Sequence, residues 1–172
     1  FKGDPTVNLI NHLIKEDNER ALPRSFFPTI TPQDIELGKI TRYYVKRNDQ
    51  YLYYETNEND YFSLSNSSQY IAWDLYSTCQ IEWIIKGDTF NVLKTNKDSV
   101  LSIESQFSQR NPNGKNWKGF SQIFKDNYLQ FYQDIQENLS TLGGEYKTSD
   151  GKEYIGLYHI HPEKGPMVGA KH

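Results

Sequence analysis

The residues best placed to do chemistry are histidines near the end of the 172-residue chain, where three of its four histidines lie: His159, His161 and His172. Residues i and i+2 of a β-strand point to the same face. His159 and His161 would therefore present two imidazoles side by side, as a divalent metal such as iron or zinc requires. A loop containing Gly and Pro follows and could return His172 to the same place or offer it to another subunit. The spacing predicts a metal site at these three residues, and the alternative is a pair of hydrogen-bonded surface histidines.

No other combination of side chains predicts catalysis. The single cysteine, Cys79, excludes a disulfide framework and a multi-cysteine metal site. Its place among alternating apolar residues favours a core position over a nucleophile. The spaced carboxylates lie in polar stretches typical of solvated surface, and there is no glycine-rich loop of the kind that cradles phosphate. We therefore expect no enzymatic activity, unless the histidines bind a catalytic metal.

The histidines are expected to be positioned by a C-terminal β-hairpin. Its predicted strands, residues 145–148 and 153–161, flank a polar turn at 149–152 that contains Asp150 and Gly151. Residues 143–172 are predicted to form this hairpin and a tail used for assembly.

Two further hairpins predict a small antiparallel sheet. The first joins residues 39–47 to 51–56, and the second joins 78–85 to 89–93 across a turn at 86–88. Side chains expected on one buried face of the second hairpin alternate along its first strand: Cys79, Ile81, Trp83 and Ile85. Residues 69–76, between the hairpins, are compatible with either a short helix or a strand.

The strongest helical pattern starts at Phe120. Apolar residues follow at steps of three and four: Phe120, Ile123, Phe124, Tyr128, Phe131, Ile135 and Leu139. Gly143 and Gly144 supply a stop. A poorly patterned segment at 96–107 precedes this helix and begins with a possible helix start. We expect the helix from Phe120 to cover the sheet, so that residues 39–142 form an α+β core.

Residues 1–38 are predicted to form a short amphipathic helix at 7–14 and an extended arm at 21–31. Prolines rule out a regular helix in the arm, which also carries two adjacent aromatic residues, Phe26 and Phe27. The arm either lies across its own domain, which we favour as the default for a compact chain, or on a neighbouring subunit.

Composition and charge exclude some classes of partner and favour others. The formal net charge of −3, with scattered basic residues, argues against nucleic acid as the main partner. No run approaches the roughly 18 apolar residues of a membrane helix, so we expect no membrane partner. The chain begins with Phe1 rather than Met, and we expect it to be a fragment. Only 36% of residues are hydrophobic, but 15% are aromatic, and this surplus is typical of interfaces.

The tetrapeptide from His159 to Pro162 resembles the zinc-binding signature of JAMM/MPN metallopeptidases. In that family two histidines and a downstream Asp hold zinc, while an upstream Glu polarises the attacking water. The resemblance implies a zinc peptidase that uses His159 and His161. The family's Ser falls here at Ala170, and its Asp falls beyond His172.

A longer resemblance covers most of the chain in order. Residues 23–47, the strand at 81–87 and above all the ending GGEYKTSDGKEYIGLYHIHPEKGPMVGAKH at 143–172 resemble virion structural proteins of tailed bacteriophages, especially contractile-tailed ones. The resemblance implies a neck, tail or baseplate subunit without enzymatic turnover, located in the virion after assembly in the host bacterial cytoplasm.

The virion resemblance also implies partners and contact residues. The partners would be other phage structural proteins and copies of the chain itself. The residues expected at interfaces lie in the arm and the tail: Phe26, Phe27, Tyr158 and Met167. Tail-spike and fibre tips of such phages hold an iron among three chains through His-x-His strands. This precedent adds a third hypothesis, a metal-dependent protein interaction module.

Overall fold

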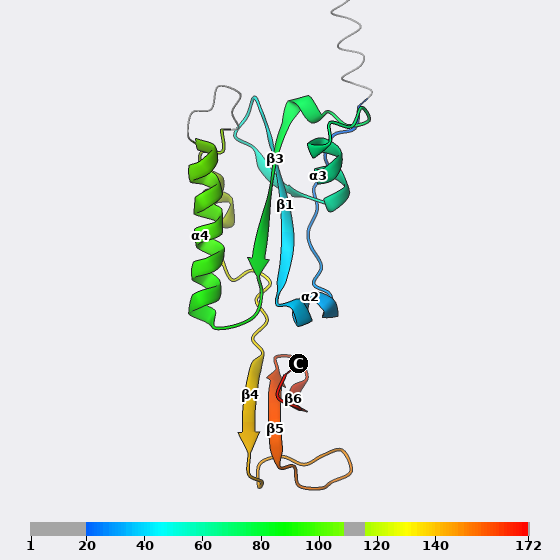
Figure 1. Ribbon diagram of the computed structural model, residues 1–172, viewed down its shortest axis with the longest axis vertical. Helices are drawn as coiled ribbons and strands as arrows, with labels where there is room; N and C mark the ends of the chain where they lie inside the picture. The colour runs from blue at the N-terminus through cyan, green and yellow to red at the C-terminus, as the bar shows by residue number, and fades with distance from the viewer. Residues whose placement is uncertain (1–19, 109–115, 172) are drawn as a thin grey trace, which may run out of the picture. The chain divides into compact units, whose positions relative to one another are not determined.

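The computed structural model describes residues 20–108 and 116–171 (Figure 1). The helix predicted at 7–14 and His172 lie outside the described residues. The chain divides into two compact units. Unit 1 comprises Phe1–Thr29, Thr41–Glu82 and Lys97–Asp126, and unit 2 comprises Ile30–Ile40, Trp83–Asn96 and Asn127–His172.

The described residues form three α-helices and two three-stranded antiparallel sheets, which confirms the predicted small α+β class. The elements follow in the order α2 (Pro32–Leu37), β1 (Lys39–Arg47), β2 (Tyr53–Thr56), α3 (Glu58–Ser65), η1 (Trp73–Leu75), β3 (Tyr76–Ile84), α4 (Thr89–Ser108), η2 (Phe120–Phe124), β4 (Gln136–Thr141), β5 (Gly156–His161) and β6 (Gly165–Val168). The prefix η marks a 3₁₀ helix.

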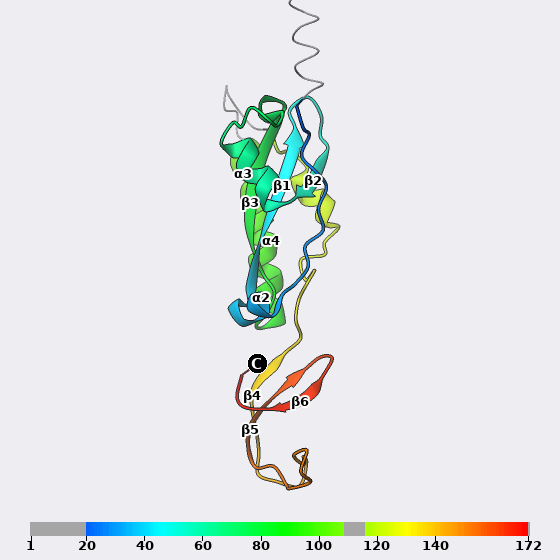
Figure 2. The same ribbon diagram turned by 90° about the vertical axis from the view of Figure 1, so that its right-hand side faces the viewer.

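The first sheet has the strand order β2-β1-β3. Its β1–β2 hairpin confirms the first predicted hairpin, with Tyr43 opposite Thr56 and Lys46 opposite Tyr53. Within unit 1, Figures 1 and 2 show α3 and the C-terminal part of α4 on opposite faces of this sheet. Residues 69–76, whose type the sequence left open, contain η1 and the first residue of β3.

Aromatic rings fill the core on one face of unit 1. Phe120 is fully buried, and its ring centroid lies 4.9 Å from that of Trp117, 5.2 Å from Tyr44 and 5.3 Å from Phe124. Such edge-to-face and tilted pairs are favourable beyond the apolar area they bury. On the other face, Val45 packs in a small aliphatic cluster with Leu64 and Ile71. Aromatic packing thus supplies much of the core of a chain with few aliphatic residues.

The helix predicted from Phe120 to Leu139 is wrong. Only the short 3₁₀ helix η2 begins at Phe120, and the last residue of the pattern, Leu139, belongs to strand β4. Lys125, Asp126 and Phe131 have φ values of +48°, +59° and +66°. These left-handed conformations end a right-handed helix. Of the apolar residues at helical spacing, Phe120, Phe124 and Tyr128 are buried from η2 and the turn after it, whereas Ile123 is 37% exposed.

The long helix is α4, where the sequence predicted a strand at 89–93. Asp88 caps its start, because the Asp88 carboxylate accepts a 3.0 Å hydrogen bond from Asn91 N–H. Val92, Asn96 and Val100 recur at steps of four and are buried, as expected for the core-facing stripe of a helix.

The start of α4 anchors the core of unit 2. The Asn96 side chain is fully buried and bonds Ile84 N–H at 2.8 Å, Ile84 O at 2.9 Å and Tyr128 O at 2.9 Å. Trp83 is also fully buried, and its indole N–H donates to Gln130 O at 2.8 Å.

Cys79, Ile81, Trp83 and Ile85 are all buried, which confirms the face predicted from their alternation.

The second sheet, called here the C-terminal sheet, has the order β4-β5-β6. The predicted third hairpin is right at its turn, where Lys147 and Glu153 form an isolated antiparallel bridge. Its strand partner is wrong, because β5 pairs with β4 and β6 rather than with residues 145–148. A β-bulge interrupts the β4–β5 register between Gln136 and Leu139.

Candidate functional site

The C-terminal sheet has two faces of different chemistry. Residues opposite each other on paired strands share a face. Leu139 lies opposite Tyr158, and Tyr158 lies opposite Val168. These residues, together with Ile160 and Pro166, form what we call the tyrosine face. His159 lies opposite Met167, and these two form the histidine face with Leu157 and His161.

The tyrosine face carries a groove of about 250 Å³. The rings of Tyr146 and Tyr158 pack at its side as a tilted pair, with centroids 4.9 Å apart and an interplanar angle of 56°. Tyr154 also lines the groove and donates its hydroxyl to Leu157 O at 2.5 Å. Val168 completes the apolar lining and is 66% exposed. The face thus offers rigid aromatic surface of the kind that is common at protein interfaces.

On the histidine face, both imidazoles are buried and each is fixed by a backbone group. His159 Nδ1 lies 3.0 Å from Gly169 O, so Nδ1 carries the hydrogen and donates it. His161 Nδ1 accepts hydrogen bonds from Glu163 N–H at 3.1 Å and Lys164 N–H at 3.3 Å. The two rings therefore hold opposite tautomers.

These tautomers bear directly on the metal hypothesis. A neutral imidazole has one lone-pair nitrogen. For His159 that nitrogen is Nε2, and a metal-binding histidine often donates its other N–H to a backbone carbonyl in this way. The lone pair of His161 already accepts the two amides. Among the described residues no group of three or more His, Cys, Asp or Glu side chains is placed to hold a metal, and His172 is not described, so metal binding stays a prediction.

The C-terminal sheet lacks a hydrophobic core of its own. Among the described residues after Tyr128, the only buried side chains are Thr141, His159 and His161. Large apolar residues are exposed in and beside the sheet: Leu142 (94%), Val168 (66%), Ile155 (63%) and Leu157 (51%). Small sheets need a packed apolar face for independent stability. The exposed side chains are therefore available to a partner.

The arm lies along the edge of β2 in unit 1, as the favoured alternative predicted. Ser25 forms an antiparallel bridge with Thr56, and Phe26 N–H donates to Glu55 O at 2.9 Å. Arg24 anchors the arm, because its backbone N–H and its guanidinium both bond the Asp60 carboxylate, at 2.9 Å and 3.2 Å.

The predicted interface residues remain accessible to different degrees. Phe26 is 46% exposed and Phe27 68% exposed, so the arm leaves both rings uncovered. Met167 is 36% exposed, and Tyr158 is half-buried against Tyr146. The structure thus places Phe26 and Phe27 in unit 1 and Tyr158 and Met167 in unit 2.

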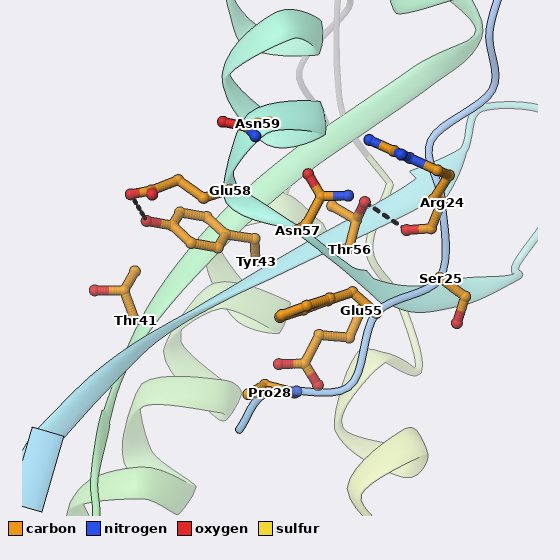
Figure 3. A pocket seen from close by; sticks show the side chains of 11 residues that line it. Arg24, Ser25, Pro28, Thr41, Tyr43, Glu55, Thr56, Asn57, Glu58 and Asn59 are labelled. Carbon is orange, nitrogen blue, oxygen red and sulfur yellow. Dashed lines mark hydrogen bonds between the residues drawn. The ribbon is translucent and has the colours of Figure 1, made fainter. Parts of the chain in front are cut away.

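A groove of about 500 Å³ lies between the arm, the β1 strand and the start of α3 (Figure 3). The figure shows the Tyr43 hydroxyl pointing toward Glu58, to which it donates at 2.9 Å. Burial, the hydrogen bond to Glu58 and the charge of Glu58 raise the pKa of Tyr43 to about 12. The hydroxyl therefore stays protonated at neutral pH, and the groove offers hydrogen-bonding groups rather than an acid–base pair.

Sequence reasoning missed two buried cations on β1. Arg42 and Lys46 are 4% and 3% exposed. Arg42 forms a two-pronged ion pair with Glu55, at 2.9 Å and 2.7 Å. Lysine and arginine are usually exposed. The one sequence signal for burial was the period-two spacing that places Arg42 and Lys46 on the same face of the strand as Tyr44.

Comparisons with known proteins return no match: no family model, no curated protein and no solved structure is similar to this chain. None of the helices in the described ranges is both long and apolar enough to cross a membrane.

Proposed function

We propose that this protein is a structural subunit that acts through contacts with other subunits, in the tail, neck or baseplate of a contractile-tailed bacteriophage virion. One observation carries the assembly role. The C-terminal sheet buries no large apolar side chain among its described residues, and Leu142, Ile155, Leu157 and Val168 are exposed in and beside it. Burying such side chains against a partner is worth about 25 cal/mol per Å² of apolar surface.

The virion assignment is supported by the sequence resemblance, which is most specific at residues 143–172, the range that includes β5 and β6 of this sheet. The partners under this proposal are copies of the chain and other phage structural proteins. The exposed rings of Phe26 and Phe27 provide a second apolar contact region on the arm.

Purified virions and recombinant protein test the two parts of the proposal separately. Mass spectrometry of particles of the phage that encodes the chain should detect it at a fixed copy number. Recombinant protein should form a defined oligomer, or a complex with another virion protein, measured by light scattering after size-exclusion chromatography.

Matched variants locate the contact surface. Val168→Asp and Ile155→Asp place a charge at exposed apolar positions, so they should weaken assembly without unfolding the chain. Phe90→Asp is the control, because Phe90 is 71% exposed on α4. Assembly that is equally sensitive to all three variants, absence of the chain from virions, or a zinc-dependent peptidase activity would overturn the proposal.

A further inference from the structure

Lys46 is a buried cation without a carboxylate partner among the described residues. The residue is 3% exposed, and its ammonium donates to Arg47 O at 3.1 Å. The Nζ atom also lies 5.1 Å from the centroid of the Tyr51 ring. Both partners are neutral. Burial lowers the pKa of Lys46, and the charge of Asp49 opposes that effect only in part.

Two acidic side chains of unit 1, one whose charge acts on Lys46 and one in the same cavity, already have cationic partners. Asp49 forms an ion pair with Arg47 at 2.8 Å. Asp74, which lines the same cavity as Lys46, forms an ion pair with Arg20 at 2.6 Å. Buried charges are normally paired, because an uncompensated one costs several kcal/mol. A ligand's negative charge would therefore be favoured beside Lys46.

Lys46 lines a cavity of about 540 Å³, a volume within the range of small-molecule sites. Neutral polar side chains share the lining with it: Asn48, Thr78 and Asn116. Trp73 and Tyr76 supply aromatic surface. Asp74 also lines the cavity, but its carboxylate is paired with Arg20. The remaining lining, with one cation, neutral polar groups and two aromatic rings, matches an organic anion that has an apolar body. A single ammonium balances one carboxylate, whereas a phosphate group carries about −1.5 to −2 charges.

We propose that this cavity binds a small aromatic carboxylate, whose charged group pairs with Lys46 and whose ring contacts Trp73 and Tyr76. The cavity shares no lining residue with the C-terminal sheet or with Phe26 and Phe27, the two proposed contact regions. The proposal of a ligand site and the proposal of an assembly role can therefore be tested independently.

Benzoate is the probe, and benzamide is its neutral isostere. Benzoate should bind saturably in a calorimetric or NMR titration, and benzamide should bind at least about tenfold more weakly, since the loss of one ion pair of about 1.4 kcal/mol corresponds to that factor. Lys46→Met should weaken benzoate binding by a similar factor. Lys118→Met is the matched control, because Lys118 is an exposed lysine of the same unit.

A second readout covers the case in which Lys46→Met fails to fold. In the unmodified protein, benzoate should slow acetylation of Lys46 by acetic anhydride, measured by peptide mass spectrometry, while the rate at Lys118 stays unchanged. No saturable binding, equal binding of benzamide, tighter binding of inorganic phosphate, or protection of Lys118 to the same extent would each overturn the proposal.

Discussion

The side-chain amide of Asn96 bonds both backbone groups of Ile84, accepting from its N–H at 2.8 Å and donating to its carbonyl at 2.9 Å. A neighbouring strand would make the same pair of bonds. Asn96 therefore continues the hydrogen bonding of β3 from a helix, and its second amide hydrogen reaches Tyr128 O.

Asn96→Leu should destabilise the protein by about 3 kcal/mol, because it leaves buried backbone groups unsatisfied at about 1–3 kcal/mol each. Urea denaturation followed by circular dichroism measures the change. Asn91→Leu, at an exposed position of the same helix, should change stability by less than about 0.5 kcal/mol. Equal effects of the two substitutions would contradict the role of the Asn96 amide.

Arg42→Met alone should lower the free energy of unfolding by about 3–5 kcal/mol. The substitution leaves the Glu55 carboxylate unpaired, and the side chain of Glu55 is only 12% exposed. The double variant Arg42→Met/Glu55→Leu should recover much of that loss, since no charge is then left unpaired. A double-mutant cycle from denaturation midpoints checks this. If the double variant is as unstable as the sum of the single variants, the two residues do not act as a pair.

The Arg24–Asp60 anchor predicts acid sensitivity of the arm. Burial alone would raise the pKa of Asp60, but hydrogen bonds from Arg24 and Asn57 outweigh it and lower the pKa below the ordinary value of 3.8. A lowered pKa contributes stability that is present above pH 3.8 and is lost as the pH falls through the folded-state value.

Asp60→Asn should therefore be less stable than the unmodified protein at pH 6, and the difference should shrink as the pH falls below about 4. Urea midpoints at several pH values measure this. A difference that stays constant across that range would show that the Asp60 charge contributes nothing.

His161→Ala should loosen the connection between β5 and β6 by about 1 kcal/mol, because it removes the acceptor for Glu163 N–H and Lys164 N–H. Asn can accept amide bonds from residues two ahead, so His161→Asn should retain more of the protection. Hydrogen exchange at the two amides compares the variants. Faster exchange in the Asn variant than in the Ala variant would contradict the predicted acceptor role.

The sequence correctly predicted the structural features that depend on local residue patterns. The β1–β2 hairpin and the buried alternation from Cys79 to Ile85 follow from β-propensity and period-two spacing. The sequence pattern did not predict helix α4, because Asn96 occupies a core position that an apolar residue normally holds. Asp88 belongs to its cap, but beside Gly87 it resembled a hairpin turn. Asn96 is recognised as a buried helix residue only when Ile84 and Tyr128 are known to lie beside it.

The site residues divide in the same way. The shared face of His159 and His161 followed from strand geometry, but their opposite tautomers depend on Gly169, Glu163 and Lys164, which only the folded backbone brings into place. The burial of Lys46 depends on Tyr51 and on packing across the sheet. No local sequence pattern encodes such contacts.

The three tryptophans report on different parts of the molecule. Trp117 is fully buried in unit 1, Trp83 is fully buried in unit 2, and Trp73 is 41% exposed beside the Lys46 cavity. Their fluorescence spectra should therefore differ in wavelength and in access to quenchers. Single-tryptophan variants would follow the unfolding of each unit separately, and Trp73 would provide an optical signal for occupancy of the cavity without any added label.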